Sequence, residues 1–354
     1  MNPWLYGNPQ IVFAIWVGIG VTLASLILFI AILVIRQVGK QREQNHLRAV
    51  ALWRKVLIDA MQSPPAEVPA LTSKDMSGFV EVWNELHETP VGTDNPGMLQ
   101  VASLVNLAPK LEKMTASGSF SHRVMAVVAL GHLRSTSSFD RLAGLINDRS
   151  PIVSITAARA LMRINAERAV QRVVPQIVER HDWVDGGIAQ MLNEAEPETV
   201  KNELGAATLR ANDEVAPRLV RFLAGVSPDA AAPVIRKLLA ETHDEHLVST
   251  CLQVMVDAND LDKVRPLLHH ERWHVRMHAA AALGRLGKES DTSVLMPLLA
   301  DTQWWVRYRT AQAVQHLFGN DASRLEQVRD SREDKYARDI LTQVIAERAL
   351  GDAS

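Results

Sequence analysis

Four stretches decide the fold of this chain: VRMHAAAALGRL at residues 275–286, VRYRTAQAVQHL at 306–317, VSITAARALMRI at 153–164 and HRVMAVVALGHL at 122–133. They align without gaps on a shared Ala-Leu or Ala-Val pair, and 31 residues separate the starts of neighbouring copies such as Val275 and Val306. Self-similarity at such a period is typical of repeat proteins. Four further copies, at Val184, Val215, Leu247 and Ala337, keep an apolar pair. The copy at Leu247 departs from the spacing of 31 residues. We therefore expect about eight units.

A second apolar helix precedes each copy, so the repeat is a pair of helices. Its apolar residues recur at spacings of three and four, as at Val170, Val173 and Ile177, which is the pattern of a helix with one buried face. Ser150 and Ser227 each precede a proline, as N-cap residues do. Three glycines fall near expected helix ends: Gly284, Gly287 and Gly319. Because neither helix of a pair can bury its apolar face without neighbours, we expect the pairs to stack into an all-α solenoid.

Two stretches of the repeat resemble HEAT repeats. They are HVRMHAAAALG at residues 274–284 and LLADTQWWVR at residues 298–307. Both are similar to the short bacterial form of the repeat, which also occurs in phycobilin-lyase-like HEAT proteins. The resemblance covers residues 104–350, and it implies an α-helical solenoid that serves mostly as a protein-interaction scaffold. A fold of this kind does not by itself specify a function.

A long apolar stretch precedes the repeats. Residues 11–35 read IVFAIWVGIGVTLASLILFIAILVI and contain no charge. As a helix they would be roughly 37 Å long, enough to cross the ~30 Å hydrocarbon layer of a bilayer. Residues 2–10 carry no charge and Arg36 follows directly, unlike a cleaved secretory signal. We therefore predict a retained transmembrane helix in contact with lipid.

The distribution of Lys and Arg predicts the orientation of this span. Within residues 36–55 the acidic side chain is Glu43, and the basic ones are Arg36, Lys40, Arg42, Arg48, Arg54 and Lys55. The positive flank of a span stays in the cytoplasm. We predict a single-pass protein of the inner membrane of a Gram-negative bacterium, with residues 1–10 as a short extracytoplasmic N-terminus. Trp4 and Tyr6 would lie at the outer interface, where aromatic residues are enriched.

Small residues recur on one face of the predicted span: Ala14, Gly18, Thr22 and Ser25. Such a face can let another transmembrane helix approach closely. The alternative is a plain anchor in which these small residues have no role.

Residues 36–103 connect the span to the repeats. We expect residues 36–62 to continue as an amphipathic juxtamembrane helix, with Leu47, Trp53 and Leu57 on its apolar face. That face could lie on the bilayer or cap the folded domain, and we favour the cap. Residues 63–103 are expected to form a proline-rich hinge and irregular N-terminal capping helices.

The composition excludes several classes of protein. The 354 residues include 38 Lys and Arg against 40 Asp and Glu, a formal net charge of −2. This balance argues against a dedicated nucleic-acid binder. The single cysteine, Cys251, excludes an intramolecular disulfide and a cysteine-based metal site. Cys251 lies among apolar residues and is expected to be buried.

One edge of the expected solenoid is the candidate partner-binding surface. It would carry Trp183, Trp273, Trp304, Trp305, Arg276, Arg307 and Arg309. Aromatic residues and arginines are over-represented in binding hot spots. There are two competing interpretations. Each indole could instead fill its own turn, and the arginines could pair with residues such as Asp301 in a ladder between repeats.

The sequence contains no motif for catalysis or cofactor binding. It lacks a Gly-rich phosphate loop, a His-Glu-x-x-His string and a Gly-x-Ser-x-Gly elbow. A histidine cluster, His269, His270, His274 and His278, lacks the further ligands that a metal site needs. We therefore expect no cofactor and no metal.

The sequence thus predicts a non-catalytic scaffold or adaptor, anchored in the inner membrane, that binds protein at the cytoplasmic membrane surface. A membrane-embedded enzyme or transporter is one candidate partner, and no nucleic acid is expected. The alternative is a phycobilin-lyase-like or metal-dependent HEAT-repeat enzyme, which would hold a chromophore or a metal. A HEAT-like nucleic-acid binder is a third and less favoured interpretation.

Overall fold

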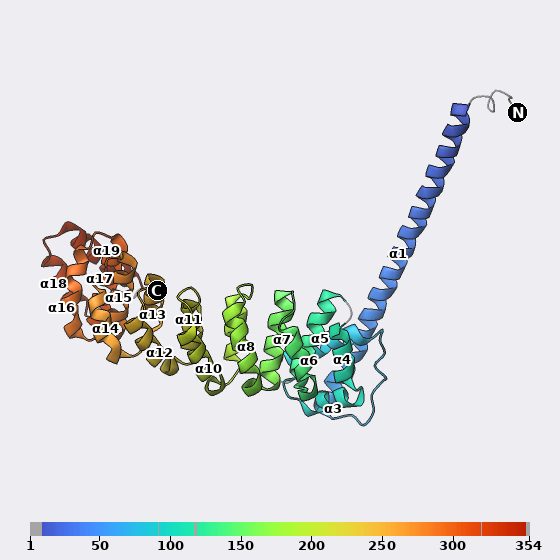
Figure 1. Ribbon diagram of the computed structural model, residues 1–354, viewed down its shortest axis with the longest axis horizontal. Helices are drawn as coiled ribbons and strands as arrows, with labels where there is room; N and C mark the ends of the chain where they lie inside the picture. The colour runs from blue at the N-terminus through green and yellow to red at the C-terminus, as the bar shows by residue number, and fades with distance from the viewer. Residues whose placement is uncertain (1–8, 91, 117–118, 320, 352–354) are drawn as a thin grey trace. The chain divides into compact units, whose positions relative to one another are not determined.

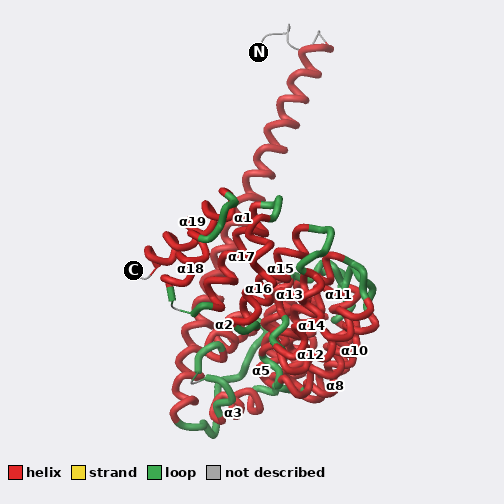
Figure 2. The backbone as a smooth tube through the Cα atoms, turned by 90° about the vertical axis from the view of Figure 1, so that its left-hand side faces the viewer, coloured by secondary structure: helices red, strands yellow, loops and turns green. Residues whose placement is uncertain are grey.

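The computed structural model describes residues 9–90, 92–116, 119–319 and 321–351. These residues form helices joined by turns and loops and include no β-strand, which confirms the predicted all-α fold class (Figure 2). The chain divides into two compact units, Met1–Ser138 and Phe139–Ser354. The predicted N-terminal segment, residues 1–10 with Trp4 and Tyr6, lies almost entirely outside the described residues.

One long helix organises the first unit. Helix α1 (Pro9–Gln62) runs for 54 residues, and its N-terminal part extends away from the rest of the unit (Figure 1). Its C-terminal part packs on α2 (Met76–His87) and α3 (Pro96–Leu104). The hairpin of α4 (Leu107–Ala116) and α5 (Phe120–Leu133) completes the unit. The predicted span and juxtamembrane helix are therefore one continuous helix.

Aromatic packing joins α1 to α2. Trp53, Phe79 and Trp83 are fully buried, and the ring centroids of Trp53 and Phe79 lie 4.9 Å apart in an edge-on arrangement. At Gly78 a Cβ would lie 2.9 Å from the Cβ of Ala49, so the missing side chain lets the two helices approach closely. The apolar face of residues 36–62 thus packs on the folded unit. Leu47, which we had placed on that face, is instead 59% exposed, because the buried face follows Ala49 and Trp53.

The apolar part of α1 lies outside this core. It has a mean hydropathy of 2.8, and none of it is buried against other parts of the chain. The predicted small-residue face is exposed at all four positions, Ala14, Gly18, Thr22 and Ser25. The Thr22 hydroxyl donates a hydrogen bond to the carbonyl of Gly18, at 2.8 Å, so its hydrogen-bonding capacity is used within the helix.

The second unit is a row of helical hairpins (Figure 1). Its pairs are α6 (Phe139–Leu145) with α7 (Pro151–Ile164), α8 (Ala166–Glu179) with α9 (Asp185–Asn193), α10 (Pro197–Arg210) with α11 (Ala216–Val226), α12 (Pro228–Glu241) with α13 (Glu245–Val254), α14 (Leu261–Leu267) with α15 (Trp273–Leu286), α16 (Thr292–Leu295) with α17 (Trp304–Leu317), and α18 (Ala322–Asp330) with α19 (Lys335–Gly351). With α4 and α5, the described residues contain eight such pairs, as predicted.

The second helices of successive pairs in this unit pack on one another, from α7 through to α19. This stacking buries the register positions Val153, Val275, Val306 and Ala337. Val184 departs from the register, because it precedes α9 as the N-cap and is 76% exposed. The apolar pair that follows it, Met191 and Leu192, is buried as expected.

We predicted that the repeats begin at residue 104, and this bound stays a prediction. The division between the two compact units falls at Ser138, after the first hairpin. Ser150 and Ser227 do precede α7 and α12 as N-cap residues. The hydroxyl of Ser227 caps its helix by accepting from the backbone N–H of Ala230.

Gly284 is buried where α15 meets α17. A Cβ at this position would lie 2.4 Å from the Cβ of Ala313 and 2.5 Å from its Cα. The end of α15 is marked by Gly287, which is its C-cap. Gly284 is therefore required for the close approach of two helices and not for a turn.

We predict that Gly284→Ala destabilises the protein by about 1–3 kcal/mol, because the added methyl group overpacks α15 against α17. Gly225→Ala in α11 is the matched control, since the added Cβ would lie more than 4 Å from every described atom outside its chain neighbours and its own helix backbone. Alanine favours a helix over glycine by about 0.5–1 kcal/mol, so the control should be neutral or stabilising. Urea denaturation followed by circular dichroism measures both. A Gly284→Ala variant as stable as its parent would contradict the close packing.

Candidate functional site

Two arginines of the predicted binding edge, Arg276 and Arg307, make hydrogen bonds at the turns between helices. Arg276 donates from Nε and Nη2 to the two carboxylate oxygens of Asp301, at 2.7 and 2.9 Å. Its Nη1 donates to the backbone carbonyls of His270 and Glu271. Arg307 likewise donates to the carbonyl of Asp301, at 2.7 Å. These two guanidinium groups hold the turns together, as the ladder interpretation proposed.

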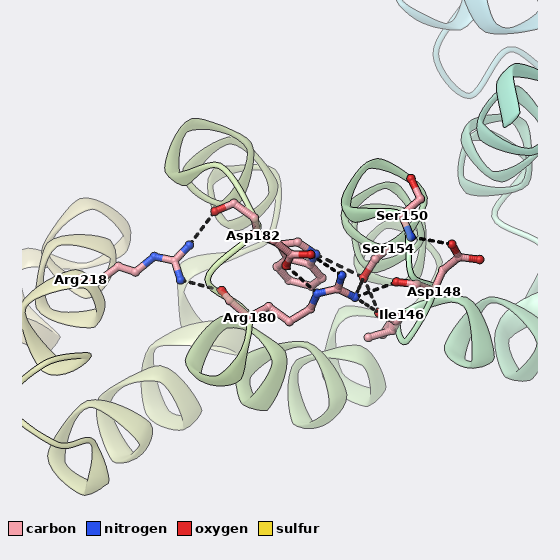
Figure 3. Close-up of polar contacts among 8 residues, drawn as sticks. Ile146, Asp148, Ser150, Ser154, Arg180, Asp182 and Arg218 are labelled. Carbon is pink, nitrogen blue, oxygen red and sulfur yellow. Dashed lines mark hydrogen bonds and ion pairs between the residues drawn. The ribbon is translucent and has the colours of Figure 1, made fainter.

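The same arrangement occurs in the repeats whose sequences diverge most (Figure 3). Arg180 donates from Nη1 to the carbonyls of Ile146 and Asp148 and to the hydroxyl of Ser154. Arg218 donates to the carbonyl of Arg180, at 3.0 Å. The arginines therefore satisfy carbonyl groups at helix ends that would otherwise lack a partner.

Trp183 belongs to this network and not to an exposed edge. It is 2% exposed, its indole Nε1 donates to Ser154 Oγ at 3.2 Å, and the Arg180 guanidinium lies 5.7 Å from its ring centroid. Trp183 is thus unavailable to a partner, and its place in the predicted binding edge was wrong. The physical reason is that hydrogen bonds hold its turn between the neighbouring hairpins. Arg180 donates to Ser154 Oγ of the preceding hairpin, and Arg218 of the following hairpin donates to the Trp183 carbonyl.

Two exposed tryptophans and the half-buried Tyr308 lie together at the start of α17. Trp304 is 39% exposed and Trp305 is 51% exposed. Trp304 meets Trp305 edge-on at 4.7 Å and stacks on Tyr308 at 4.9 Å. The Tyr308 hydroxyl donates to Glu347 of α19, at 2.8 Å. We call Trp304, Trp305 and Tyr308 the aromatic edge.

Tyr308 was missed by the sequence analysis, although its spacing of four residues from Trp304 is the signal that could have revealed it. Trp273, from the preceding repeat, is 39% exposed and meets His274 edge-on at 5.8 Å. Among the predicted arginines, Arg309 has an exposed side chain, and its Nη1 donates to Gln312. Within the described residues no carboxylate lies within 4.0 Å of it.

Residues of the predicted histidine cluster lie in two different places. His274 and His278 line an open hollow together with His243 and His246 of the preceding repeat. His270 lies in a turn, where its Nδ1 accepts from the backbone N–H of Arg272. Among the described residues, no group of three or more His, Cys, Asp or Glu side chains is arranged to hold a metal ion.

Cys251 is fully buried in α13. Burial raises the pKa of its thiol to about 12. At neutral pH it is therefore protonated and shielded from solvent, so it is a poor nucleophile.

Comparison with known proteins supports the repeat. A family model described as HEAT repeats matches residues 108–193 and 249–315, and these two regions support a HEAT-repeat family. HEAT repeats generally mediate protein–protein interaction. No curated protein matches the chain.

Many solved structures are similar to this chain, and two of them are the following. An engineered protein is 17% identical, covering 85% of this chain and 98% of its own, with a TM-score of 0.33. A chain from a homology model of the full-length AP-3 complex in an intermediate open conformation is 14% identical. It covers 82% of this chain and 57% of its own, with a TM-score of 0.38.

We predict that Asp301→Asn destabilises the protein by about 1–3 kcal/mol at pH 7, because Arg276 loses its carboxylate partner in a largely buried turn. Burial alone would raise the pKa of Asp301, but hydrogen bonds from Arg276 and the Gln303 N–H lower it below its ordinary value of 3.8. The stabilisation is therefore present above pH 3.8 and is lost as the pH falls through the lower pKa of the folded state.

Urea denaturation of parent and variant should show the same difference at pH 7 and pH 5 and a narrowing difference below pH 3.8. Asp140→Asn is the control, because Asp140 is 76% exposed in its pair with Arg168, and exposed pairs contribute little. Equal stability of Asp301→Asn and its parent at pH 7 would contradict the structural role of the pair.

Proposed function

We propose that this protein is a non-catalytic scaffold, anchored in the inner membrane by α1, that binds a protein partner through the aromatic edge. The observation that carries the proposal is the contrast within α1. One end of this helix is strongly apolar and unburied by any described part of the chain, whereas the other end lies in the core of the first unit.

Lipid is the environment that fits the apolar end of α1. Phe13, Trp16 and Ile27 are each at least 68% exposed. Exposure of apolar surface to water costs roughly 25 cal/mol per Å², and a helix satisfies its own backbone hydrogen bonds within a bilayer. Because the same helix continues to Trp53 in the core, the anchor is built into the folded unit and does not depend on a flexible linker.

The basic flank of the span supports an orientation with the C-terminal side in the cytoplasm. Arg36, Lys40, Arg42 and Arg48 are all exposed along α1. Positive residues at this position favour retention on the cytoplasmic side. The small-residue face at Ala14, Gly18, Thr22 and Ser25 would allow a partner's transmembrane helix to approach.

The repeats supply the binding surface in this proposal. Exposed tryptophans are frequent binding hot spots, and the aromatic edge presents two of them side by side. Tethering to the membrane raises the effective concentration of the scaffold near other membrane proteins. A membrane-embedded enzyme or transporter is therefore the kind of partner we propose.

The predicted topology can be tested by cysteine labelling. Gln10→Cys should react with a membrane-impermeant maleimide in intact spheroplasts, whereas Gln44→Cys should react only after permeabilisation. The native Cys251 gives a low background, because it is buried and its thiol has a raised pKa. The parent protein, labelled before and after permeabilisation, is the control. Labelling of both introduced cysteines in intact spheroplasts would contradict the proposed topology.

The aromatic edge can be tested by crosslinking in intact membranes. We expect Trp304→Ala/Trp305→Ala to lose the crosslinked neighbours of the parent protein without a change in the urea midpoint, because both indoles are substantially exposed. Ile152→Ala/Val184→Ala is the matched control, since these apolar residues are also exposed, by 54% and 76%. Capture of the same neighbours by the tryptophan variant would rule out the edge as the contact surface.

A further inference from the structure

A polar groove crosses the second helices α13, α15 and α17 of the second unit. It consists of two adjoining hollows of about 530 and 320 Å³, which share Gln253 and His278 as lining residues. His246 and Ser249 line the first hollow, and Arg285 and Arg309 line the second. We call these six residues the groove.

Two cations in the groove have no carboxylate partner. Arg285 donates from Nη2 to the carbonyls of Leu252 and Met255, at 3.1 and 3.0 Å, and Arg309 donates to Gln312. Within the described ranges, no carboxylate lies within 4.0 Å of either guanidinium. Arg276, in contrast, is neutralised by both oxygens of Asp301. The groove therefore has positive charge that the fold does not compensate.

Ser249 gives an independent indication of a ligand. It is 4% exposed and lines the first hollow. Its Oγ has no hydrogen-bond partner in the described part of the chain. Buried hydroxyl groups are nearly always hydrogen-bonded, so this hydroxyl is available to a polar group that enters the groove.

The charges around His278 agree with this picture. Burial lowers its pKa, and the nearby His274 and Arg309 lower it further. Its Nε2 lies 2.9 Å from Gln253 Nε2, within hydrogen-bonding distance of that side chain. The other titratable groups that line the first hollow are His243, His246, His274, Asp244 and Glu245.

The two carboxylates of the first hollow are already engaged. Asp244 caps α13 by accepting from the backbone N–H of Leu247, at 2.7 Å. Glu245 accepts from Arg272, at 2.6 Å, and lies 3.6 Å from His274. They are therefore poor partners for Arg285 and Arg309.

We propose that the groove binds an extended acidic segment of the protein partner. Arg285 and Arg309 would pair with its carboxylates, and the Ser249 hydroxyl would donate to it. This inference rests on the proposed scaffold function and specifies the chemistry of the partner. The groove and the aromatic edge adjoin, because Trp305 precedes Arg309 by four residues on the same face of α17. A segment that leaves the groove can therefore continue onto the edge.

A peptide fits the groove better than a nucleic acid does. The residues that line the two hollows include no Trp, Tyr or Phe on which a base could stack. The two hollows together also extend well beyond the size of a single phosphate ion.

Fluorescence anisotropy of a labelled octaglutamate peptide with the full-length protein in detergent micelles tests the proposal. We expect binding that weakens about fivefold to tenfold in Arg309→Gln and in Arg285→Gln. Ser249→Ala should weaken it by about twofold to threefold. Arg172→Gln is the matched control and should bind like the parent, because Arg172 is an exposed arginine on α8, outside the groove.

Proton uptake supplies a second measurement. Bound carboxylates favour the charged form of His278 and raise its pKa, so binding at pH 7 should take up protons. Titration calorimetry in buffers with different ionisation enthalpies measures this uptake, and His278→Gln should reduce it. Arg309→Gln keeps the proposal testable should Arg285→Gln fail to fold, because Arg309 is exposed and its bond goes only to Gln312 within the described chain.

Several outcomes would overturn the groove proposal. They are no octaglutamate binding, equal binding by the groove variants and the parent, tighter binding of an octathymidylate that the same variants weaken, or displacement of the peptide by equimolar inorganic phosphate. The scaffold proposal fails on different results. It is contradicted if the parent forms no crosslinks in membranes, and it survives if crosslinks at the aromatic edge persist while octaglutamate does not bind.

Discussion

Each hairpin of the second unit can bury its apolar face only against the next hairpin, and the rest of the unit depends on this constraint. The contact of α15 with α17 shows it clearly. Gly284 has no side chain, so Ala313 can approach the α15 backbone, and Val275 of α15 and Val306 of α17 are fully buried. Since the stacked faces are used for stability, the residues that we propose for binding lie on the remaining faces and at the turns.

The arginines show how one residue type takes two roles in such a repeat. Arg180, Arg218 and Arg276 are held by turn carbonyls and acidic side chains, and they fix one hairpin to the next. Arg285 is also anchored by carbonyls but has no acidic partner within the described residues. In our proposal, the lack of a carboxylate partner in the described chain leaves the charge of Arg285 available to a ligand, whereas the charge of Arg276 is neutralised by Asp301. Tryptophans differ in a similar way. The indole of Trp183 is buried and donates to Ser154, whereas Trp305 is exposed.

The first unit joins two environments in one helix. Trp53 and Leu57 of α1 are fully buried in protein, whereas Phe13 and Trp16 of the same helix are exposed. The bidentate pair of Arg54 with Glu85 and the close contact at Gly78 hold α2 against this helix. If the apolar end of α1 lies in lipid, as we propose, that end also orients the folded unit, because both ends belong to one helix with continuous backbone hydrogen bonds.

Local sequence determined the helices, the repeat of paired helices, the number of pairs and the long apolar N-terminal stretch, because these depend on spacings within about thirty residues of one chain segment. Sequence also singled out Trp304, Trp305 and Arg309, which the structure leaves exposed. It could not separate them from Trp183 and Arg276, and it did not identify Ser249 or Arg285. Those distinctions depend on partners in a neighbouring hairpin, such as Ser154 for Trp183 and Asp301 for Arg276. Only the stacking of the hairpins brings such partners together, so burial and charge compensation at each site were decided by the tertiary structure.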